Sequence, residues 1–342
     1  MEIIKLDIND QRWQEFLSRD DHLVFHIPQY KKFIEEAFGT TYTVLAAVDN
    51  DEIKAILPLV EIKSKLLGNK IISSAYIEYG GFAGDEASIS HILHFLDQQH
   101  KHNHDYLEIR GGLDSFNAIL SSKLIKRNWY KRFILPLENE KETWNKIQHS
   151  KRKAINRGLE SLQVKEVPLV DLKIFYELYC RNMKSFGSPP YSQNYFKSFY
   201  DTIINNHIGK IFGSYHQGKL VSALIGFCYR DRVHILIAVS DPTYNEYRPN
   251  DAMHWSFIKW ACNNNYKWFD FGRVREDSGQ FEYKQKWGPT LMDLPSYFLL
   301  WKAKEVPEVD PKKHELLVKV WKKLPLRATK LLGMRIRKGL GI

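Results

Sequence analysis

The same order of predicted elements occurs twice in this chain of 342 residues. Each half contains two apolar segments that flank a short polar turn, "TYTVLAAVDNDEIKAILPLVEI" in the first half and "KIFGSYHQGKLVSALIGFCY" in the second. Apolar runs rich in β-branched and aromatic residues on both sides of such a turn predict a β-hairpin. A repeated hairpin limits the possible folds, because the elements that follow it must also correspond.

The segments after the two hairpins do correspond. In each half an amphipathic helix precedes a strand, "YLEIRGG" in the first half and "WFDFGRV" in the second. The apolar positions of the helices are Ile89, Ile92, Leu93 and Leu96, and then Met253, Phe257 and Trp260. The turn and the final strand are 58 residues apart in the first half (Asn50 to Glu108) and 53 in the second (Gln217 to Asp270). We therefore predict a tandem duplication of one α/β unit.

The length also predicts two domains, since a single core rarely extends over so long a chain. We expect an α/β (α+β) class in which two similar domains each contain a mixed sheet flanked by helices. The predicted divisions are a first domain at 1–137, a basic helical connector at 138–162, a second domain at 163–302 and a basic amphipathic tail at 303–342.

The formal charge of +10 is concentrated at the end of the chain. Residues 312–342 contain ten basic residues and one acidic residue, which leaves a charge of about +1 for the preceding 311 residues. Such a neutral body argues against extensive contact with nucleic acid. Three distant cysteines fit neither a disulfide framework nor a zinc site, and no signal peptide or spanning segment is evident. We expect a cytoplasmic protein, with its tail at the inner face of the membrane.

Several motifs together resemble a known family. The second unit, read as "VHILIAVSD", "PTYNEYRPN", "DAMHWSFIKWACNN" and "KWFDFGRV", is similar to the cofactor-binding half of a GNAT-type acyltransferase. The duplication resembles the FemAB group of aminoacyl and acyl transferases, in the branch of cell-wall or surface-polysaccharide proteins, up to about Trp301. The motifs that match this group are "YGG" at 79–81, "RKAINRGL" at 152–159, "MKSFGSPP" at 183–190, "RPND" at 248–251, "DFGR" at 270–273 and "FEYKQKWG" at 281–288.

The resemblance implies an acyl transfer without a bound cofactor. Acetyl-CoA enzymes of the GNAT type place glycines before the helix that binds the pyrophosphate, whereas "TYNEYRPN" contains none. The family instead implies transfer from an activated donor such as aminoacyl-tRNA, held by its acceptor arm, to an amine of a lipid-linked or nucleotide-linked cell-envelope precursor. A related alternative uses an acyl thioester as the donor. An alternative of another class is a non-catalytic scaffold that binds a polyanion or a membrane.

The resemblance assigns the catalytic role to Lys284, in the aromatic-Lys motif before "WG", although Tyr283 replaces the more usual phenylalanine. Its ammonium would stabilise the oxyanion that forms when the amine attacks. Arg273 follows a strand that ends in Gly272, where it could bind a phosphate or a carboxylate, or pair with Asp270 or Glu282. Asp270 could orient either cation or have a structural role. We further interpret "WFDFGRVREDSGQFEYKQKWG" as a strand, a turn and a second strand.

The predicted substrate-binding residues fall in both halves. In the first half, Tyr79, Gly80, Gly81 and Arg110 would form the acceptor edge, although two glycines also suit an ordinary turn. In the second half, the candidates are Arg152 and Arg157 of the run from Lys151, Asn250 and Trp287. The basic run could equally be a solvated connector. Asn250 is foremost a predicted helix N-cap, and Trp287 either walls the site or belongs to the core.

Neither a metal nor a covalent intermediate is predicted. The histidines of "HILHFLDQQHKHNH" lack partners at ligand spacing, and no Ser/His/Asp or Cys/His arrangement is evident. The tail contains Leu316, Leu317, Val320, Trp321 and Leu324 at helical spacing, with lysines on the other faces and Pro325 after them. A basic amphipathic helix of this kind predicts peripheral contact with a membrane through residues 312–342, with nucleic acid as the rival partner.

Overall fold

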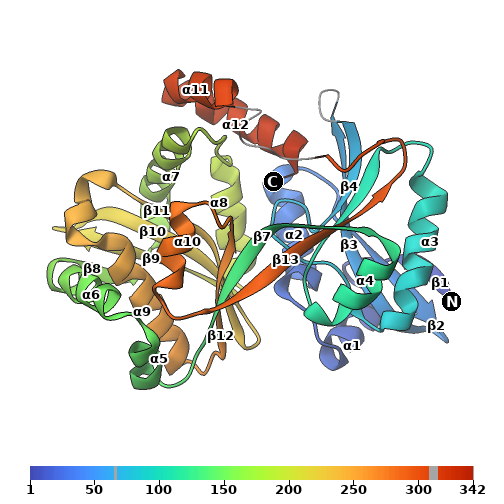
Figure 1. Ribbon diagram of the computed structural model, residues 1–342, viewed down its shortest axis with the longest axis horizontal. Helices are drawn as coiled ribbons and strands as arrows, with labels where there is room; N and C mark the ends of the chain where they lie inside the picture. Colours follow the sequence, from blue (N-terminus) through green and yellow to red (C-terminus); the bar gives the residue numbers. More distant parts are fainter. Residues whose placement is uncertain (65–67, 308–314, 342) are drawn as a thin grey trace. The chain divides into compact units, whose positions relative to one another are not determined.

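The computed structural model describes residues 1–64, 68–307 and 315–341. Lys312 and Lys313 of the predicted tail, and its last residue Ile342, lie outside the described residues. The chain forms two compact units, which are described separately below (Figure 1). Unit 1 comprises Met1–Trp129, Leu294–Lys312 and Arg335–Ile342, and unit 2 comprises Tyr130–Asp293 and Lys313–Met334.

Unit 1 contains a mixed sheet with the strand order β1-β2-β3-β4-β6-β13, and the short strand β5 pairs with β3. Its strands are β1 (Glu2–Lys5), β2 (Thr43–Asp49), β3 (Glu52–Ser64), β4 (Gly68–Ser73), β5 (Ala83–Gly84), β6 (Tyr106–Arg110) and, from Leu294 onward, β13 (Thr290–Leu300). Its helices are α1 (Gln11–Arg19), α2 (Pro28–Phe38), α3 (Ile89–His100) and α4 (Asn117–Lys123). The first predicted hairpin is the antiparallel pair β2 and β3.

In unit 2 the strands follow the order β7-β12-β11-β10-β9-β8 and form both parallel and antiparallel pairs. Its strands are β7 (Ile125–Pro136, in this unit from Tyr130), β8 (Gln163–Glu166), β9 (Gly209–His216), β10 (Lys219–Tyr229), β11 (Arg232–Ser240) and β12 (Trp268–Val274). Its helices include α5 (Glu140–Lys146), α6 (His149–Ser161), α7 (Leu172–Phe186), α8 (Gln193–Phe199), α9 (Pro249–Asn263) and α10 (Gly279–Gln285). Helices α9 and α7 both pack on β10 and β11, and Figure 1 shows them on opposite sides of these strands.

Both units have the same crossover. In unit 1, β4 and β6 are parallel neighbours connected through α3, and in unit 2, β11 and β12 are parallel neighbours connected through α9. A parallel pair requires such a crossover, because its second strand must start at the same end as the first. The next neighbour of each pair, β13 or β7, is antiparallel. The predicted fold class, two α/β units each with a mixed sheet flanked by helices, is confirmed.

The predicted apolar faces form the core of each unit. Ile89, Ile92, Leu93 and Leu96 of α3 are buried against the unit 1 sheet. Met253 and Phe257 of α9 are buried in the main core of unit 2. Their helical spacing therefore predicted the buried positions correctly except for Trp260, which is only partly buried against the same core.

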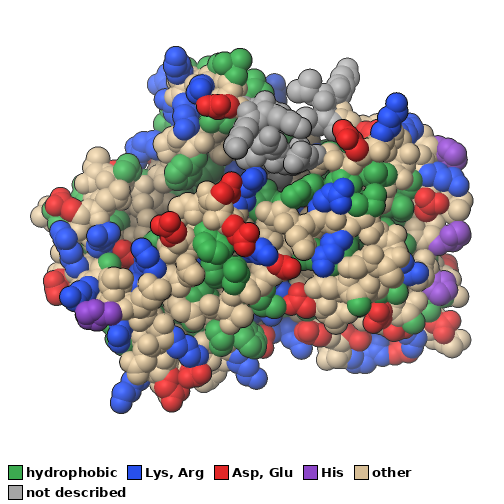
Figure 2. All heavy atoms as spheres, viewed as in Figure 1, with side chains coloured by type: hydrophobic (Ala, Val, Ile, Leu, Met, Phe, Trp, Pro, Cys, Tyr) green, Lys and Arg blue, Asp and Glu red, His purple; other side chains and the backbone are tan. Residues whose placement is uncertain are grey.

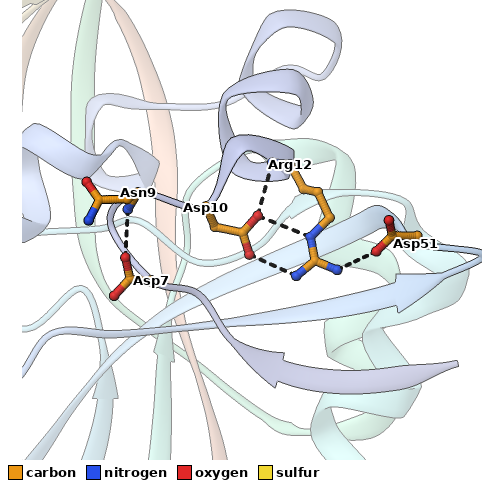
Figure 3. A network of polar contacts seen from close by, with 5 residues as sticks. All are labelled: Asp7, Asn9, Asp10, Arg12 and Asp51. Atoms are coloured by element: carbon orange, nitrogen blue, oxygen red, sulfur yellow. Dashed lines mark hydrogen bonds and ion pairs between the residues drawn. The ribbon is translucent and has the colours of Figure 1, made fainter.

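An exposed polar network ties α1 of unit 1 to the β2–β3 turn (Figure 3). Asp10 is the N-cap of α1 and accepts a hydrogen bond from the backbone N–H of Arg12 at 3.0 Å. The guanidinium of Arg12 binds Asp10 at 2.9 Å and Asp51 of the turn at 2.6 Å. Hydrogen bonding to Arg12 lowers the pKa of Asp10. This network helps to orient the helix. Because Arg12 and Asp51 are solvated, it contributes little to the stability of the unit.

The tail forms two helices, α11 (Glu315–Lys323) and α12 (Leu326–Leu340), separated near Pro325 as predicted. We predicted that Trp321 would lie on the face of α11 that contacts a membrane. It is instead buried in unit 2, and its Nε1–H donates to the carbonyl of Ser188 at 3.1 Å. The close approach of α11 to Gly187 explains this orientation, because Val318 contacts that glycine. The end of α12 belongs to unit 1, where Gly341 is buried.

Candidate active site

The candidate site lies where β12 leaves its parallel neighbour β11. The two strands pair as far as His234 opposite Asp270. Farther along, β12 continues beside β7, and its register shifts between Asp270 and Arg273. Gly272 lies within this irregular segment with a φ of +71°, a left-handed conformation that favours glycine. The carbonyl groups of Gly272 and Arg273, beside this irregularity, accept side-chain hydrogen bonds.

Lys284 provides those hydrogen bonds. It lies on α10, half-buried, and its Nζ donates to the carbonyl of Arg273 at 2.9 Å and to that of Gly272 at 3.2 Å. Bonds to two backbone oxygens fix the ammonium relative to the end of β12. Lys284 and Arg273, predicted to act at one site, are thus in direct contact through the Arg273 backbone.

Asp270 and Arg273 have different surroundings. Asp270 is fully buried, and its Oδ1 accepts a hydrogen bond from the backbone N–H of Gly272 at 2.9 Å, so it supports the left-handed turn. The Arg273 guanidinium lies over the Tyr130 ring, 4.8 Å from its centroid. This cation–π contact keeps the side chain half-buried at the end of β12. The roles assigned to both residues in catalysis stay predictions.

The segment that contains Lys284 is a helix, so our interpretation of "FEYKQKWG" as a strand is wrong. Residues Gly279–Gln285 form α10, and the turn continues with a hydrogen bond from the Trp287 N–H to the Lys284 carbonyl. Tyr283 and Trp287 are four residues apart and pack against the same core, which a helical turn allows and strand alternation does not favour. Lys284 reaches the backbone of Arg273 because α10 packs against the end of β12.

Beneath α10 lies a buried ion pair that the sequence analysis did not identify. Lys151 of α6 and Asp251 of α9 form an ion pair of 2.7 Å, and their side chains are only 6% and 8% exposed. Burial lowers the pKa of Lys151, while Asp251 acts in the opposite direction. One signal was present in the sequence: Lys151 lies four residues before Ile155 and seven before Gly158, on the buried face of α6. A cation on a buried face requires a counter-ion.

Two aromatic rings of the α10 segment pack against the ammonium group of this buried ion pair. The Lys151 Nζ lies 3.7 Å from the centroid of Tyr283 and 5.2 Å from that of Trp287. Burial raises the pKa of Tyr283 well above its usual range, and the negative charge of Asp251 acts in the same direction. Trp287 is fully buried, and its Nε1–H has no hydrogen-bond partner among the described residues. Trp287 therefore belongs to the core of unit 2.

His254 is the neutral neighbour of this network. Its Nδ1 lies 2.7 Å from the Asn250 carbonyl, which can only accept, so Nδ1 carries the proton. The Tyr283 hydroxyl lies 3.4 Å from the same nitrogen. Burial lowers the pKa of His254 to about 4. The imidazole is uncharged at neutral pH and adds no second cation beside Lys151.

Asn250 is not the N-cap that we predicted. Helix α9 begins at Pro249, and its N-cap is Arg248, whose φ is +54°. Proline suits the first helical position because it has no N–H to leave unpaired. Asn250 therefore lies inside the first turn, where its Nδ2 donates to Ser240 Oγ at 2.9 Å. Its Oδ1 is buried without a hydrogen-bond partner among the described residues, and its substrate contact stays a prediction.

The two arginines of the basic run have different positions on α6. Arg157 is exposed, whereas Arg152 is half-buried and its Nε has no hydrogen-bond partner within the described part of the chain. Lys151 is buried, so the run is not simply a solvated connector. The substrate contacts predicted for Arg152 and Arg157 remain predictions.

The predicted acceptor residues lie together in unit 1. Tyr79 is buried in the core, and Gly80 and Gly81 donate their N–H groups to the carbonyls of Gly111 and Arg110. The Arg110 guanidinium is buried and donates to the Ile77 carbonyl at 2.7 Å and to the Gly341 carbonyl at 3.0 Å. Its Nε also donates to Glu108 at 3.2 Å, so three of its five N–H donors are used within unit 1.

Comparison with known proteins assigns the second unit. Residues 145–285 match a family model described as an acetyltransferase (GNAT) domain. The matched segment is similar to a GNAT domain and includes Lys151, Asp251, Tyr283 and Lys284. No curated protein matches the chain.

Solved structures extend the likeness to both units. The structure of FemX is similar with a TM-score of 0.70 and 14% sequence identity, over 93% of this chain and 100% of that chain. L-PGS from Bacillus licheniformis is similar with a TM-score of 0.56 and 11% identity, over 96% and 99% of the two chains. A tandem GNAT protein from the clavulanic acid biosynthesis pathway has a TM-score of 0.56 and 9% identity, over 89% and 99%. The chain has a tandem GNAT-like fold, as predicted.

Neither a membrane-spanning helix nor a metal site is found among the described residues. No helix in the described ranges is long and apolar enough to cross a membrane. No group of three or more His, Cys, Asp or Glu side chains is placed to hold a metal ion within residues 1–64, 68–307 and 315–341.

Proposed function

We propose that the protein transfers an aminoacyl, or another acyl, group from an activated donor to an amine of a cell-envelope precursor. The main support is the position of Lys284 in the GNAT domain, where two backbone carbonyls hold its ammonium at the end of β12. A charge fixed in advance stabilises a transition state without reorganisation during the reaction. Aminoacyl-tRNA is the donor that we propose, and a lipid-linked or nucleotide-linked precursor is the acceptor.

The proposed reaction is direct aminolysis. The amine nitrogen attacks the ester carbonyl carbon, and the carbonyl oxygen becomes an oxyanion that accepts a hydrogen bond from Lys284. The ester C–O bond then breaks, the acyl group remains on nitrogen as an amide, and the proton lost by the amine appears on the departing alcohol. Orientation of the two substrates supplies the remaining acceleration. No covalent enzyme intermediate is required.

The donor is the part of the proposal most open to direct test. The segment Pro242–Tyr247 before α9 is a 3-10 helix without a glycine, which argues against a pyrophosphate cradle of bare backbone N–H groups. The family description, an acetyltransferase domain, favours instead an acyl thioester. We expect transfer from a mixed aminoacyl-tRNA pool to persist in the presence of excess acyl-CoA. Transfer of the acyl-CoA group, with none from aminoacyl-tRNA, would select the thioester donor.

The tail suits a lipid-linked acceptor. On α11, Leu316, Leu317 and Val320 are 75%, 66% and 52% exposed, although large apolar side chains are usually covered. Figure 2 shows hydrophobic side chains beside Lys and Arg side chains over α11. Residues 315–341 contain eight basic residues and one acidic residue. We propose that this surface binds an anionic membrane, since apolar burial and lipid charge act together there.

Vesicle binding tests this surface. The triple variant Leu316→Ser, Leu317→Ser and Val320→Ser is expected to lose co-sedimentation with vesicles that contain anionic lipid, because it removes three exposed apolar side chains and leaves the charge unchanged. Val170→Ser, at an 81% exposed valine in another part of unit 2, is the matched control and should bind normally. Unchanged binding of the triple variant would contradict the role of α11. Binding to RNA but not to vesicles would favour the rival partner.

A further inference from the structure

The ion pair between Lys151 and Asp251 lies beneath the helix of Lys284 but takes no part in any step of the proposed acyl transfer. Both residues are in the first turn of a helix, Lys151 on α6 and Asp251 on α9. The helix dipole favours an acidic residue there and disfavours a basic one. Buried ion pairs are often no more stabilising than apolar residues of the same volume, and their best-attested use is to select one arrangement of packed elements. The element that this pair would select is α10.

Side chains of the α10 segment surround the Lys151 ammonium. The Tyr283 ring lies 3.7 Å from Nζ and the Trp287 ring 5.2 Å from it. The Tyr283 hydroxyl also lies 3.4 Å from Nδ1 of His254, a residue of α9 like Asp251, so one residue of α10 contacts both helices that carry the pair. Tyr283 immediately precedes Lys284 in the chain. A movement of Tyr283 would therefore displace the backbone that carries Lys284.

The backbone beside Lys151 makes a second connection to the same segment. The N–H of Gln148, the N-cap of α6, donates to the Lys286 carbonyl at 3.1 Å. Gly288 has a φ of +75°, and a Cβ at that position would collide with the carbonyl oxygen of Lys146. The segment just before α6 is thus in close contact with the segment just after α10.

We propose that Lys151 and Asp251 are positioning residues for Lys284. They orient α10 so that the ammonium of Lys284 lies on the carbonyls of Gly272 and Arg273. This inference rests on the proposed function insofar as it concerns catalysis, but the orientation of Lys284 can be measured without any transfer reaction.

The direct test is the chemical reactivity of the Lys284 amine. Folded protein is treated with a reductive methylation reagent, and the rate at Lys284 is followed by peptide mass spectrometry. In Lys151→Met, we expect Lys284 to react at least about tenfold faster, the factor that corresponds to one lost hydrogen bond of ordinary strength. Lys141→Met, at an exposed lysine of α5, is the matched control and should leave the rate unchanged.

Two further variants separate orientation from folding. The double variant Lys151→Met/Asp251→Asn removes both charges, so it should unfold at a higher temperature than Lys151→Met, but its Lys284 should remain fast-reacting. Tyr283→Phe keeps the ring over Lys151 and removes only the hydroxyl, which lies 3.4 Å from Nδ1 of His254 on α9. It should also increase the rate of methylation at Lys284, but by less than Lys151→Met does. Unchanged Lys284 reactivity in folded Lys151→Met and in Tyr283→Phe would overturn the proposal.

Transfer kinetics provide the catalytic readout. Lys151→Met should lower kcat at least about tenfold with little change in KM, because the interaction lost is one made in the transition state. In a Lys284→Ala background, the same substitution should have no further effect on kcat, and equal effects in both backgrounds would contradict a positioning role. If Lys284 becomes reactive as expected but the wild type transfers no acyl group from any donor, the orientation inference stands and the proposed function fails.

Discussion

Lys284→Ala is expected to lower acyl transfer by about 10²- to 10³-fold, or about 2.7 to 4 kcal/mol, the effect of removing one donor from an oxyanion site. The reason is that the ammonium held by the carbonyls of Gly272 and Arg273 is lost, and alanine provides no donor in its place. The measurement is kcat with saturating donor and acceptor. The unfolding temperature should stay near that of the wild type, since Lys284 is only half-buried.

Lys267→Ala is the control for this substitution. Lys267 is exposed and directly precedes β12. Its substitution therefore changes the net charge by the same amount as Lys284→Ala, but at the opposite end of the strand. The control should keep wild-type transfer. Full activity of Lys284→Ala in folded protein would remove Lys284 from the mechanism, and equal losses in both variants would indicate a general effect of charge.

The second large effect is expected on stability. Asp251→Asn should lower the free energy of unfolding of unit 2 by about 3 to 5 kcal/mol, because Lys151 remains buried without its counter-ion. The 6% exposure of Lys151 leaves it little access to water. Thermal unfolding and urea titration measure the change, with the double variant Lys151→Met/Asp251→Asn as the comparison.

The double variant should recover a large part of the stability lost by Asp251→Asn, since it leaves no unpaired buried cation. A double-mutant cycle then gives the interaction free energy of the pair. If Asp251→Asn changes stability by less than about 1 kcal/mol, as is typical for exposed pairs, the ion pair is solvated rather than buried.

The elements with clear hydrophobic periodicity could be predicted from the sequence. The hairpin β2–β3, the hairpin β9–β10 and helices α3 and α9 each combine a regular apolar pattern with a distinct turn or end. α10 could not be assigned in this way. Its seven residues alternate aromatic and polar side chains over a short stretch, which suits a strand until the burial of Tyr283 and Trp287 against Lys151 is known.

The site depends on contacts between distant residues, and sequence reasoning located it only in part. Lys284 and Arg273 were found through a family resemblance, and the structure joins them through a backbone hydrogen bond. Lys151 and Asp251 are 100 residues apart, and a run of basic residues does not reveal which of its members is buried. Likewise, the bond between Arg110 and Gly341 spans 231 residues, so the environment of that arginine was not predictable.

The most direct measurement is the intact mass of candidate envelope precursors after incubation with the protein and a mixed aminoacyl-tRNA pool. With the wild type, we expect a defined mass gain equal to one acyl residue on an amine-bearing precursor, and no gain with Lys284→Ala. The size of the gain would identify the transferred group. The same gain with both proteins, or none with the wild type across aminoacyl-tRNA and acyl-CoA donors, would contradict a Lys284-dependent acyl transfer.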